Sequence, residues 1–395
     1  MTDPGVDGLT SRARKLVPAI RGRAEAVEAA RRMSDDTIAD LTAAGLFRVL
    51  QPKRYGGYEA DLEAFARVVL ELGRACGSTA WVYSVVAMHQ WHLGMFPDEA
   101  QHDLWGADPD AIVSSAYAPT GTAISDADGY RLSGTWGFAS ACDATGWAIL
   151  GGRVVDAAGR TTVQMFFLVP KRDYTIDDNW HVLGLSGTGS KNVVVRDAFV
   201  PRHRTLSVAD CLSGAPPGAT VNDRALYRVP FFAAVGTCLC MPAVATAQGA
   251  LEDYVESTRS RVTRGAALGG GRQMAELPTI QLRVAEATAM LDAARTIVLR
   301  DLVDTQATVT SGLPLTPDQR LRNRLNHAFA ARLAREAVDR LFESGGGQAL
   351  FHASPFQRAW RDVHASVKHI SLNWDAVGTL YGKFALGLPL EGAQF

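Results

Sequence analysis

Residues 361–389 have the sequence RDVHASVKHISLNWDAVGTLYGKFALGLP, in which apolar residues recur at helical spacing. His369 and Asn373 are four positions apart, so a continuous helix would place them on one face. A histidine that titrates near physiological pH, beside an amide that can orient it, suits proton transfer or polar contact with a ligand. A satisfied structural pair is equally compatible with the pattern. His364 would lie about 140° around such a helix from His369, so the two rings cannot face one pocket.

Helical spacing extends backwards from this stretch almost without interruption. Four amphipathic segments with short Gly or Pro breaks are predicted near 231–262, 278–311, 316–344 and 355–382. Long helices joined by short loops are typical of an antiparallel bundle. The sequence therefore predicts a C-terminal four-helix bundle over residues 221–395.

The chain before the bundle has two different textures. Between 111 and 212, short β-branched or aromatic runs are separated by the turn sequences DADG and DAAG, which predicts an antiparallel β-barrel or sandwich. Residues 1–110 are mostly helical, with helices expected after Ser34, over Asp61–Arg74 and around 81–96. The predicted class is α+β, mainly α, in the order helices, sheet, helical bundle.

Composition limits the possible partners and compartment. The 395 residues carry a net charge of -1 and are 47% hydrophobic, which is typical of a soluble protein and gives no field that would recruit nucleic acid or an anionic membrane. The five cysteines show no C-x-x-C spacing, which argues against a disulfide framework and a zinc site. No signal core and no apolar run of about 18 residues is evident. We expect a cytoplasmic protein with a small-molecule partner.

Six motifs occur in an order that resembles a known family. They are SDDTIADLTAAGLFRVLQPKRYGG (34–57), ACGSTAW (75–81), HLGMFPDEAQ (92–101), WGFAS (136–140), LGLSGTGSKNVVVRDAFVP (183–201) and RDVHASVKH (361–369). Together they resemble the acyl-CoA dehydrogenase fold. More closely, they resemble the flavin-dependent monooxygenases built on it, the oxygenase components of two-component aromatic hydroxylases. The resemblance covers about residues 30–388.

The resemblance implies a specific chemistry. Reduced flavin, FMNH2 or FADH2, would come from a separate NAD(P)H:flavin reductase and react with O2 to give a C4a-hydroperoxide. That species would pass one oxygen atom to a phenolic or polycyclic aromatic substrate. The chain has no G-x-G-x-x-G fingerprint of its own, which agrees with this division of labour. The resemblance also implies a homotetramer, arranged as a dimer of dimers.

The resemblance further implies catalytic positions. Ser140 matches a serine near flavin N5, and His369 would lie over the flavin with Asn373 as its orienting neighbour. His89 and Ser115 match positions that hold the phenolic oxygen of the substrate. An ordinary phenol and an imidazole differ by about 3.5 pKa units, or roughly 4.8 kcal/mol, so simple deprotonation by histidine is unfavourable.

Other residues are expected around the ligands. His92 is an alternative to His89 on the same predicted helix, and Arg228 could close over the ligand. The predicted pocket walls are Trp91, Phe96, Trp136, Phe138 and Trp374, with Trp136 on the same strand face as Ser140. The predicted contacts of the flavin phosphate are Gly187, Thr188, Gly189, Ser190, Arg259, Arg261, Gly346 and Gly347. The resemblance implies that an arginine of this kind and the Gly346 and Gly347 loop come in part from a neighbouring subunit.

Three alternatives remain open at this stage. N-hydroxylation of an amine or amino sugar would need an acidic contact, for which Asp143 is the candidate. Acyl-CoA dehydrogenation would need a late catalytic glutamate, and only Glu343 and Glu391 lie near the required region. A non-catalytic flavin-binding or scaffold protein would show no oxygen-dependent turnover. Structural roles for the individual residues are the alternative at each position.

Overall fold

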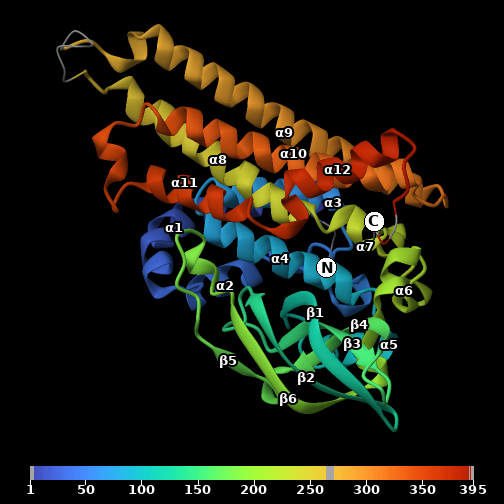
Figure 1. Ribbon diagram of the computed structural model, residues 1–395. Helices are drawn as coiled ribbons and strands as arrows, with labels where there is room; N and C mark the ends of the chain where they lie inside the picture. Colours follow the sequence, from blue (N-terminus) through green and yellow to red (C-terminus); the bar gives the residue numbers. More distant parts are fainter. Residues whose placement is uncertain (1–3, 264–270, 391, 393–395) are drawn as a thin grey trace.

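A computed structural model describes residues 4–263, 271–390 and 392, and shows a β-sheet below two layers of helices (Figure 1). The N-terminal helices form the middle layer and the C-terminal helices form the upper one. The N-terminal helices are α1 (Gly5–Ala30), α2 (Asp35–Ala43), α3 (Leu62–Gly73), α4 (Gly77–Leu93) and α5 (Asp98–Trp105). The predicted order of helices, sheet and helical domain is therefore confirmed.

The predicted helix starts in this layer are also confirmed. The Ser34 hydroxyl accepts a hydrogen bond from the Thr37 backbone N–H and so caps α2, and two aspartates occupy the first turn, where the helix dipole favours negative charge. Asp61 precedes α3. Every residue of α4 is buried, because this helix lies between the sheet and the upper layer. A polar side chain on α4 must therefore find a partner inside the protein.

The sheet is mixed, and the prediction of a fully antiparallel one is wrong. Its strands are β1 (Val113–Asp126), β2 (Gly129–Ala139), β3 (Trp147–Val155), β4 (Thr161–Pro170), β5 (Thr175–Asp177), β6 (Lys191–Pro201) and β7 (Thr205–Ser207). Their order is β5-β6-β2-β1-β3-β4-β7, in which β1 and β3 are parallel and the other pairs are antiparallel. The chain reverses into β2 on one side of β1 and reverses again into β3 on the other, so β3 runs in the direction of β1.

The connection to the bundle and the bundle itself are helical. Their helices are α6 (Val208–Ser213), α7 (Phe231–Ala234), α8 (Thr237–Arg259), α9 (Pro278–Thr310), α10 (Pro317–Phe342), α11 (Pro355–Ser366) and α12 (Trp374–Ala385). Among the described residues, one helical stretch, 231–259, is long and apolar enough to cross a membrane. Of its most apolar window of 18 residues, 83% is buried within the protein, as expected for the central helix of a packed bundle.

The last predicted helix, 355–382, is two helices, so His369 and Asn373 do not share a helix face. The His369 ring accepts from the Ser371 N–H through Nδ1 at 3.2 Å, and Asn373 Oδ1 accepts from the Ala376 N–H at 3.0 Å. Each side chain caps a new helical turn, which offers the backbone an alternative to continuing α11. Asn373 is exposed and committed to capping α12, so its predicted role as the orienting neighbour of His369 is wrong.

The cysteines are separate, buried thiols. All five are free, and they lie at positions 76, 142, 211, 238 and 240. Burial raises the pKa of each thiol, in the case of Cys142 to about 11. Cys238 and Cys240 lie in the hydrophobic core.

Candidate active site

His89 on α4 and Ser115 on β1 form a hydrogen-bonded pair with a defined direction. His89 Nδ1 is 2.6 Å from the Val113 carbonyl oxygen, and His89 Nε2 is 2.7 Å from Ser115 Oγ. A carbonyl oxygen only accepts, so Nδ1 carries the ring hydrogen and Nε2 accepts from the serine hydroxyl. The Ser115 hydroxyl therefore has no hydrogen left for a ligand. The Tyr117 hydroxyl is a second neighbour of the Ser115 oxygen, which leaves one lone pair to accept a hydrogen bond from a ligand O–H. The structure brings together the two residues predicted to hold the phenolic oxygen of the substrate.

Burial makes His89 a weak base. It lowers the pKa of His89 to about 4, the hydrogen bond to Val113 opposing this only in part. Because an ordinary phenol has a pKa of about 10, full transfer of the phenolic proton to His89 would cost about 8 kcal/mol. The pair therefore binds and orients a phenolic O–H, and it can take the proton only as the phenolic oxygen becomes more acidic during reaction.

His92, Trp91 and Phe96 lie behind this pair instead of lining an open pocket. His92 Nδ1 is 3.0 Å from the Tyr117 hydroxyl and His92 Nε2 is 3.5 Å from Cys211 Sγ, so both ring nitrogens have protein partners. Trp91 stacks on Phe231, whereas Phe96 packs against the His92 ring. The side chains of His92, Trp91 and Phe96 are all fully buried. Burial also lowers the pKa of His92 well below its usual value. Direct contact of these three side chains with substrate, as predicted, is not supported.

Ser140 and His369 meet at one tryptophan, although they are far apart in the sequence. Trp81 on α4 donates from Nε1 to Ser140 Oγ at 3.1 Å, and its ring centroid is 6.4 Å from that of His369. Trp81 ends the motif ACGSTAW, but nothing in the sequence marks it as a site residue. Burial lowers the pKa of His369 to about 4, so its ring is neutral at physiological pH. Because Nδ1 accepts from Ser371, the ring hydrogen is on Nε2, which can donate to a ligand.

His364 points elsewhere, as expected from its separation from His369. Its Nε2 is 2.8 Å from Asp339 Oδ1, and its ring packs on Trp360. Of the two C-terminal histidines, only His369 lies beside Trp81.

The strand end that carries Ser140 is strained. Phe138 and Ala141 both have positive φ, 65° and 61°, which non-glycine residues rarely adopt. The register of β2 against β6 shifts between Trp136 and Ala139, so side chains no longer alternate regularly here. Strain of this kind is concentrated at ligand sites.

This irregularity overturns the predicted position of Trp136. Its side chain is buried in the core of the sheet, and its Nε1 donates to the Gly151 carbonyl oxygen at 2.6 Å. Trp136 therefore does not share the ligand-facing side with Ser140. Phe138 is 76% exposed and packs edge-on against Trp180, and so it remains a candidate wall.

The loop 187–190 is packed inside the protein, so its predicted contact with a flavin phosphate is not supported. A Cβ on Gly187 would lie 2.3 Å from Val27 of α1, and the Thr188 and Gly189 backbone N–H groups bond within the loop. Ser190 Oγ is 2.7 Å from Ser140 Oγ. The loop supports Ser140 from behind.

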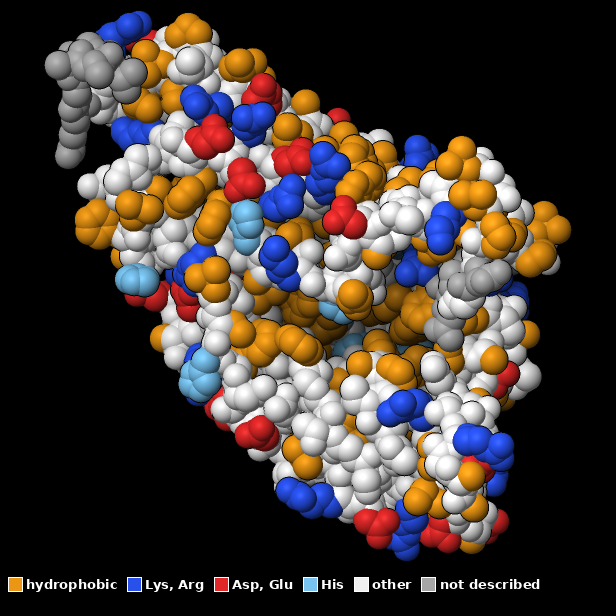
Figure 2. Space-filling view, viewed as in Figure 1, with side chains coloured by type: hydrophobic (Ala, Val, Ile, Leu, Met, Phe, Trp, Pro, Cys, Tyr) orange, Lys and Arg blue, Asp and Glu red, His pale blue; other side chains and the backbone are white. Residues whose placement is uncertain are grey.

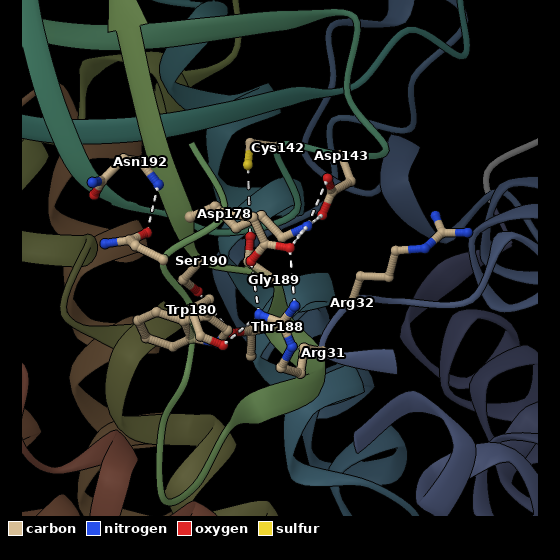
Figure 3. Close-up of polar contacts among 12 residues, drawn as sticks. Arg31, Arg32, Cys142, Asp143, Asp178, Trp180, Thr188, Gly189, Ser190 and Asn192 are labelled. Atoms are coloured by element: carbon tan, nitrogen blue, oxygen red, sulfur yellow. Dashed lines mark hydrogen bonds and ion pairs between the residues drawn. The ribbon is translucent and has the colours of Figure 1, made fainter. Parts of the chain in front are cut away.

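An ion-pair cluster holds this loop against the end of α1 (Figure 3). Lys191 Nζ is 3.0 Å from Asp143 and 3.2 Å from Asp178, and Arg31 is 2.7 Å from Asp178. The hydrogen bond from Arg31, together with Lys191, lowers the pKa of Asp178 to about 2. Asp143 is thus held by a buried lysine, which argues against the predicted contact between Asp143 and a substrate ammonium.

The two candidate phosphate arginines have different surroundings. Arg261 donates to the carbonyl oxygens of Ser344 and Gly345 at 2.7 and 3.0 Å, which brings it to the loop that contains Gly346 and Gly347. Arg259 is exposed and pairs with Glu256 in the preceding turn of its own helix, an ordinary surface arrangement. The structure therefore favours Arg261.

The other predicted contacts are more remote or unsupported. Arg228 is partly buried in a short turn before α7. Trp374 packs on Phe329 and Arg332 of α10. Glu343 ends α10, 3.6 Å from Arg283, and is not placed as a catalytic base. Glu391 lies outside the described residues.

A hollow opens between the sheet and the helices, and apolar and histidine side chains line it (Figure 2). Phe138 on the sheet and Ile370 next to His369 are 76% and 77% exposed, which is unusual for large apolar side chains. A flat apolar ring with polar edges fits these surroundings, because Ser140 Oγ and His369 Nε2 supply an acceptor and a donor. The residues present therefore fit a flavin.

Comparisons with known proteins agree with this geometry. Residues 10–107 match the family described as acyl-CoA dehydrogenase, N-terminal domain, and residues 237–374 match acyl-CoA dehydrogenase, C-terminal domain. The chain is 42% identical to the FADH2-dependent resorcinol hydroxylase, oxygenase component, of Rhizobium sp. over 389 residues, 97% of this chain and 95% of that protein. It is 40% identical to the flavin-dependent monooxygenase oxygenase subunit HsaA of Rhodococcus jostii, covering 95% of this chain and 97% of that protein.

Solved structures give the same result. The 3-HSA hydroxylase from Rhodococcus sp. superposes with a TM-score of 0.92 at 38% identity, covering 96% of this chain and 97% of that one. XiaF from Streptomyces sp., solved with FADH2 and glycerol, superposes with a TM-score of 0.91 at 29% identity, covering 99% and 98%. The chain belongs to the flavin-dependent monooxygenases of the acyl-CoA dehydrogenase fold, as the oxygenase component of a two-component aromatic hydroxylase.

Proposed function

We propose that the substrate of this enzyme is a phenol, held by its hydroxyl group at Ser115 and His89. The observation that carries this proposal is the direction of the bond between them, in which Ser115 donates to His89 Nε2 and keeps an acceptor oxygen. A phenolic O–H can donate to that oxygen, whereas an ether or unsubstituted ring cannot. Among the relatives, one is named for resorcinol and another for p-hydroxyphenylacetate, both phenols.

Residues on the flavin side would control the fate of oxygen. Reduced flavin, when bound, supplies the electrons that activate O2 for transfer of one oxygen atom to the ring. Ser140 and His369 both contact Trp81 and are proposed to face the flavin. The neutral His369 would donate from Nε2 to the oxygen atom that leaves. The buried aromatic residues behind His92 help to exclude water.

The test is hydroxylation by the purified chain. Supplied with chemically reduced FMN or FAD and oxygen, it is expected to convert phenol, resorcinol or p-hydroxyphenylacetate to products that are one oxygen atom heavier. Mass spectrometry identifies the products, and the two flavins are compared at equal concentration. Anisole, which lacks the O–H, is the matched control and is expected to be oxidised far more slowly. Equal turnover of phenol and anisole would contradict the proposed role of Ser115.

We further propose a homotetramer, a dimer of dimers, in which a neighbouring copy helps to complete the flavin site. Leu350 and Phe351 follow the loop held by Arg261 and are 71% and 61% exposed, a concentration of apolar surface that a second copy could cover. Sedimentation velocity is expected to give four times the chain mass of 42.4 kDa. Phe351→Glu is expected to dissociate the assembly and weaken flavin binding, and a monomeric wild type would reject this part.

Because the chain is an oxygenase component, its reduced flavin must come from a separate reductase. We propose that both proteins act in the cytoplasm, where the five free thiols stay reduced.

A further inference from the structure

A chain of hydrogen bonds crosses the protein behind the proposed flavin site. Trp81 Nε1 is 3.1 Å from Ser140 Oγ, Ser140 Oγ is 2.7 Å from Ser190 Oγ, and Ser190 Oγ is 2.7 Å from Thr188 Oγ1. Thr188 Oγ1 is in turn 2.8 Å from the Leu185 carbonyl oxygen. The three hydroxyl side chains are at most 7% exposed, so water does not replace these partners. Four contacts therefore connect three hydroxyl groups in a row. The row begins at the indole N–H of Trp81 and ends at the carbonyl oxygen of Leu185.

The ends of the chain determine the direction of every bond within it. An indole N–H can only donate, and a carbonyl oxygen can only accept. Between them, three hydroxyl hydrogens must fill three contacts. This is possible only if Thr188 donates to Leu185, Ser190 donates to Thr188, and Ser140 donates to Ser190. Any reversal leaves two oxygen atoms facing each other without a hydrogen, which is unfavourable in a buried site.

The Leu185 carbonyl oxygen has other donors, but the threonine contact is the shortest. The Leu185 carbonyl oxygen also accepts from Trp180 Nε1 and from the Thr188 backbone N–H, each at 3.1 Å. Lys191 directly follows Ser190 in the sequence, and its ion pairs with Asp143 and Asp178, which are labelled in Figure 3, hold this end of the loop. The loop is thus fixed from two sides.

The consequence is that Ser140 can only accept from a ligand. Its hydrogen is committed to Ser190, and one of its lone pairs is occupied by Trp81, so one lone pair is left. Reduced flavin carries a hydrogen on N5, whereas oxidised flavin presents a lone pair there. A fixed acceptor therefore attracts the reduced form and repels the oxidised form at the same atom.

We propose that Ser190 and Thr188 are positioning residues that lock the Ser140 hydroxyl as an acceptor, and that this lock makes the site selective for reduced flavin. The inference rests on the proposed function only in that Ser140 must face flavin N5. It assigns the loop a role different from the phosphate contact predicted from the sequence.

The test compares the two redox states of one flavin on the full-length protein. Dissociation constants for oxidised FMN and FAD are measured by fluorescence, and those for the reduced flavins are measured anaerobically. In Ser190→Ala the Ser140 hydrogen is released and can donate to oxidised N5. The preference for reduced over oxidised flavin is expected to fall about tenfold, equivalent to lowering the potential of the bound flavin by about 30 mV.

Two threonine variants form a matched pair. Thr188→Val keeps the shape but removes the acceptor for Ser190, and it is expected to reduce the preference in the same direction. Thr188→Ser keeps the hydroxyl and is expected to preserve the preference. A general loosening of the site would weaken both redox states together, so the ratio of the two dissociation constants separates the lock from a structural defect.

Ser140→Ala distinguishes the two ways of failing. If Ser140→Ala changes the ratio but Ser190→Ala and Thr188→Val do not, the lock is rejected and the flavin site stands. If Ser140→Ala leaves both dissociation constants unchanged, Ser140 does not face the flavin, and the placement of the flavin under the proposed function is rejected with it.

Discussion

Replacing His369 with alanine is expected to turn most oxygen consumption into release of hydrogen peroxide. His369 lies against Trp81, whose indole N–H donates to Ser140, and its neutral ring can donate from Nε2. Without that donor the negative charge that develops on the departing oxygen loses its hydrogen bond, and removal of one such donor commonly costs about 100-fold in rate. The hydroxylation rate is therefore expected to fall by about that factor, while reduced flavin still binds and reacts with oxygen. Product and peroxide are quantified together against the flavin consumed.

The control for this variant addresses the second role of His369, which is to cap a helical turn. His369→Asn keeps a capping oxygen and a side-chain N–H donor, and asparagine is among the best capping residues. It is expected to fold like the wild type and to recover part of the coupling. Unchanged coupling in His369→Ala would reject the proposed role, and equal uncoupling in both variants would show that the imidazole itself is required.

The second large effect is expected at the phenol-binding pair. Ser115→Ala removes the acceptor for the phenolic O–H and leaves His89 Nε2, which is buried, without its donor. A phenolic O–H that is buried without its acceptor costs up to about 3 kcal/mol, so kcat/KM for a phenol should fall by about 100-fold. The same variant should change kcat/KM for anisole little, because anisole cannot donate to Ser115. Steady-state kinetics with the two substrates measures the difference, and equal losses on both would contradict the assignment.

The two buried histidines of the site, His89 and His369, predict the pH dependence of activity. Burial lowers the pKa of both His89 and His369 from the ordinary 6.5 to about 4, so both are neutral above that pH and become protonated only in stronger acid. The kcat/KM profile should therefore lack a step near 6.5 and should decline only as the pH falls towards 4. Folding stability should also fall with pH between about 6.5 and 4, because the unfolded chain binds protons on these histidines before the folded chain does.

Local sequence patterns were sufficient for the element types and for several boundaries. Capping by Ser34 and the long helical periodicity of α8, α9 and α10 depend on residues close in the chain, and these features were predicted correctly. The family resemblance was confirmed as well. The parallel pairing of β1 and β3 was missed because strand order depends on contacts that no local pattern records.

The errors at the site have local physical causes. Trp136 and Ser140 have even spacing, which predicts one face only if the strand is regular, and the shift between Trp136 and Ala139 breaks that regularity. The helix through His369 ended because two side chains capped new turns. Both errors result from polar groups or strain overriding a simple periodicity. Trp81 was missed because an apolar helix gives no sign of which aromatic residue will meet a strand end.

The burial of the five thiols has a consequence for an enzyme that handles oxygen. Every uncoupled turnover releases an oxidant inside or beside the protein, and hydrogen peroxide attacks cysteine as the thiolate. Burial keeps all five in the protonated form by raising their pKa, and each lies out of reach of solvent. The fold thereby keeps its thiols protonated and away from solvent, which are the two conditions that slow their oxidation by the by-product of uncoupled turnover.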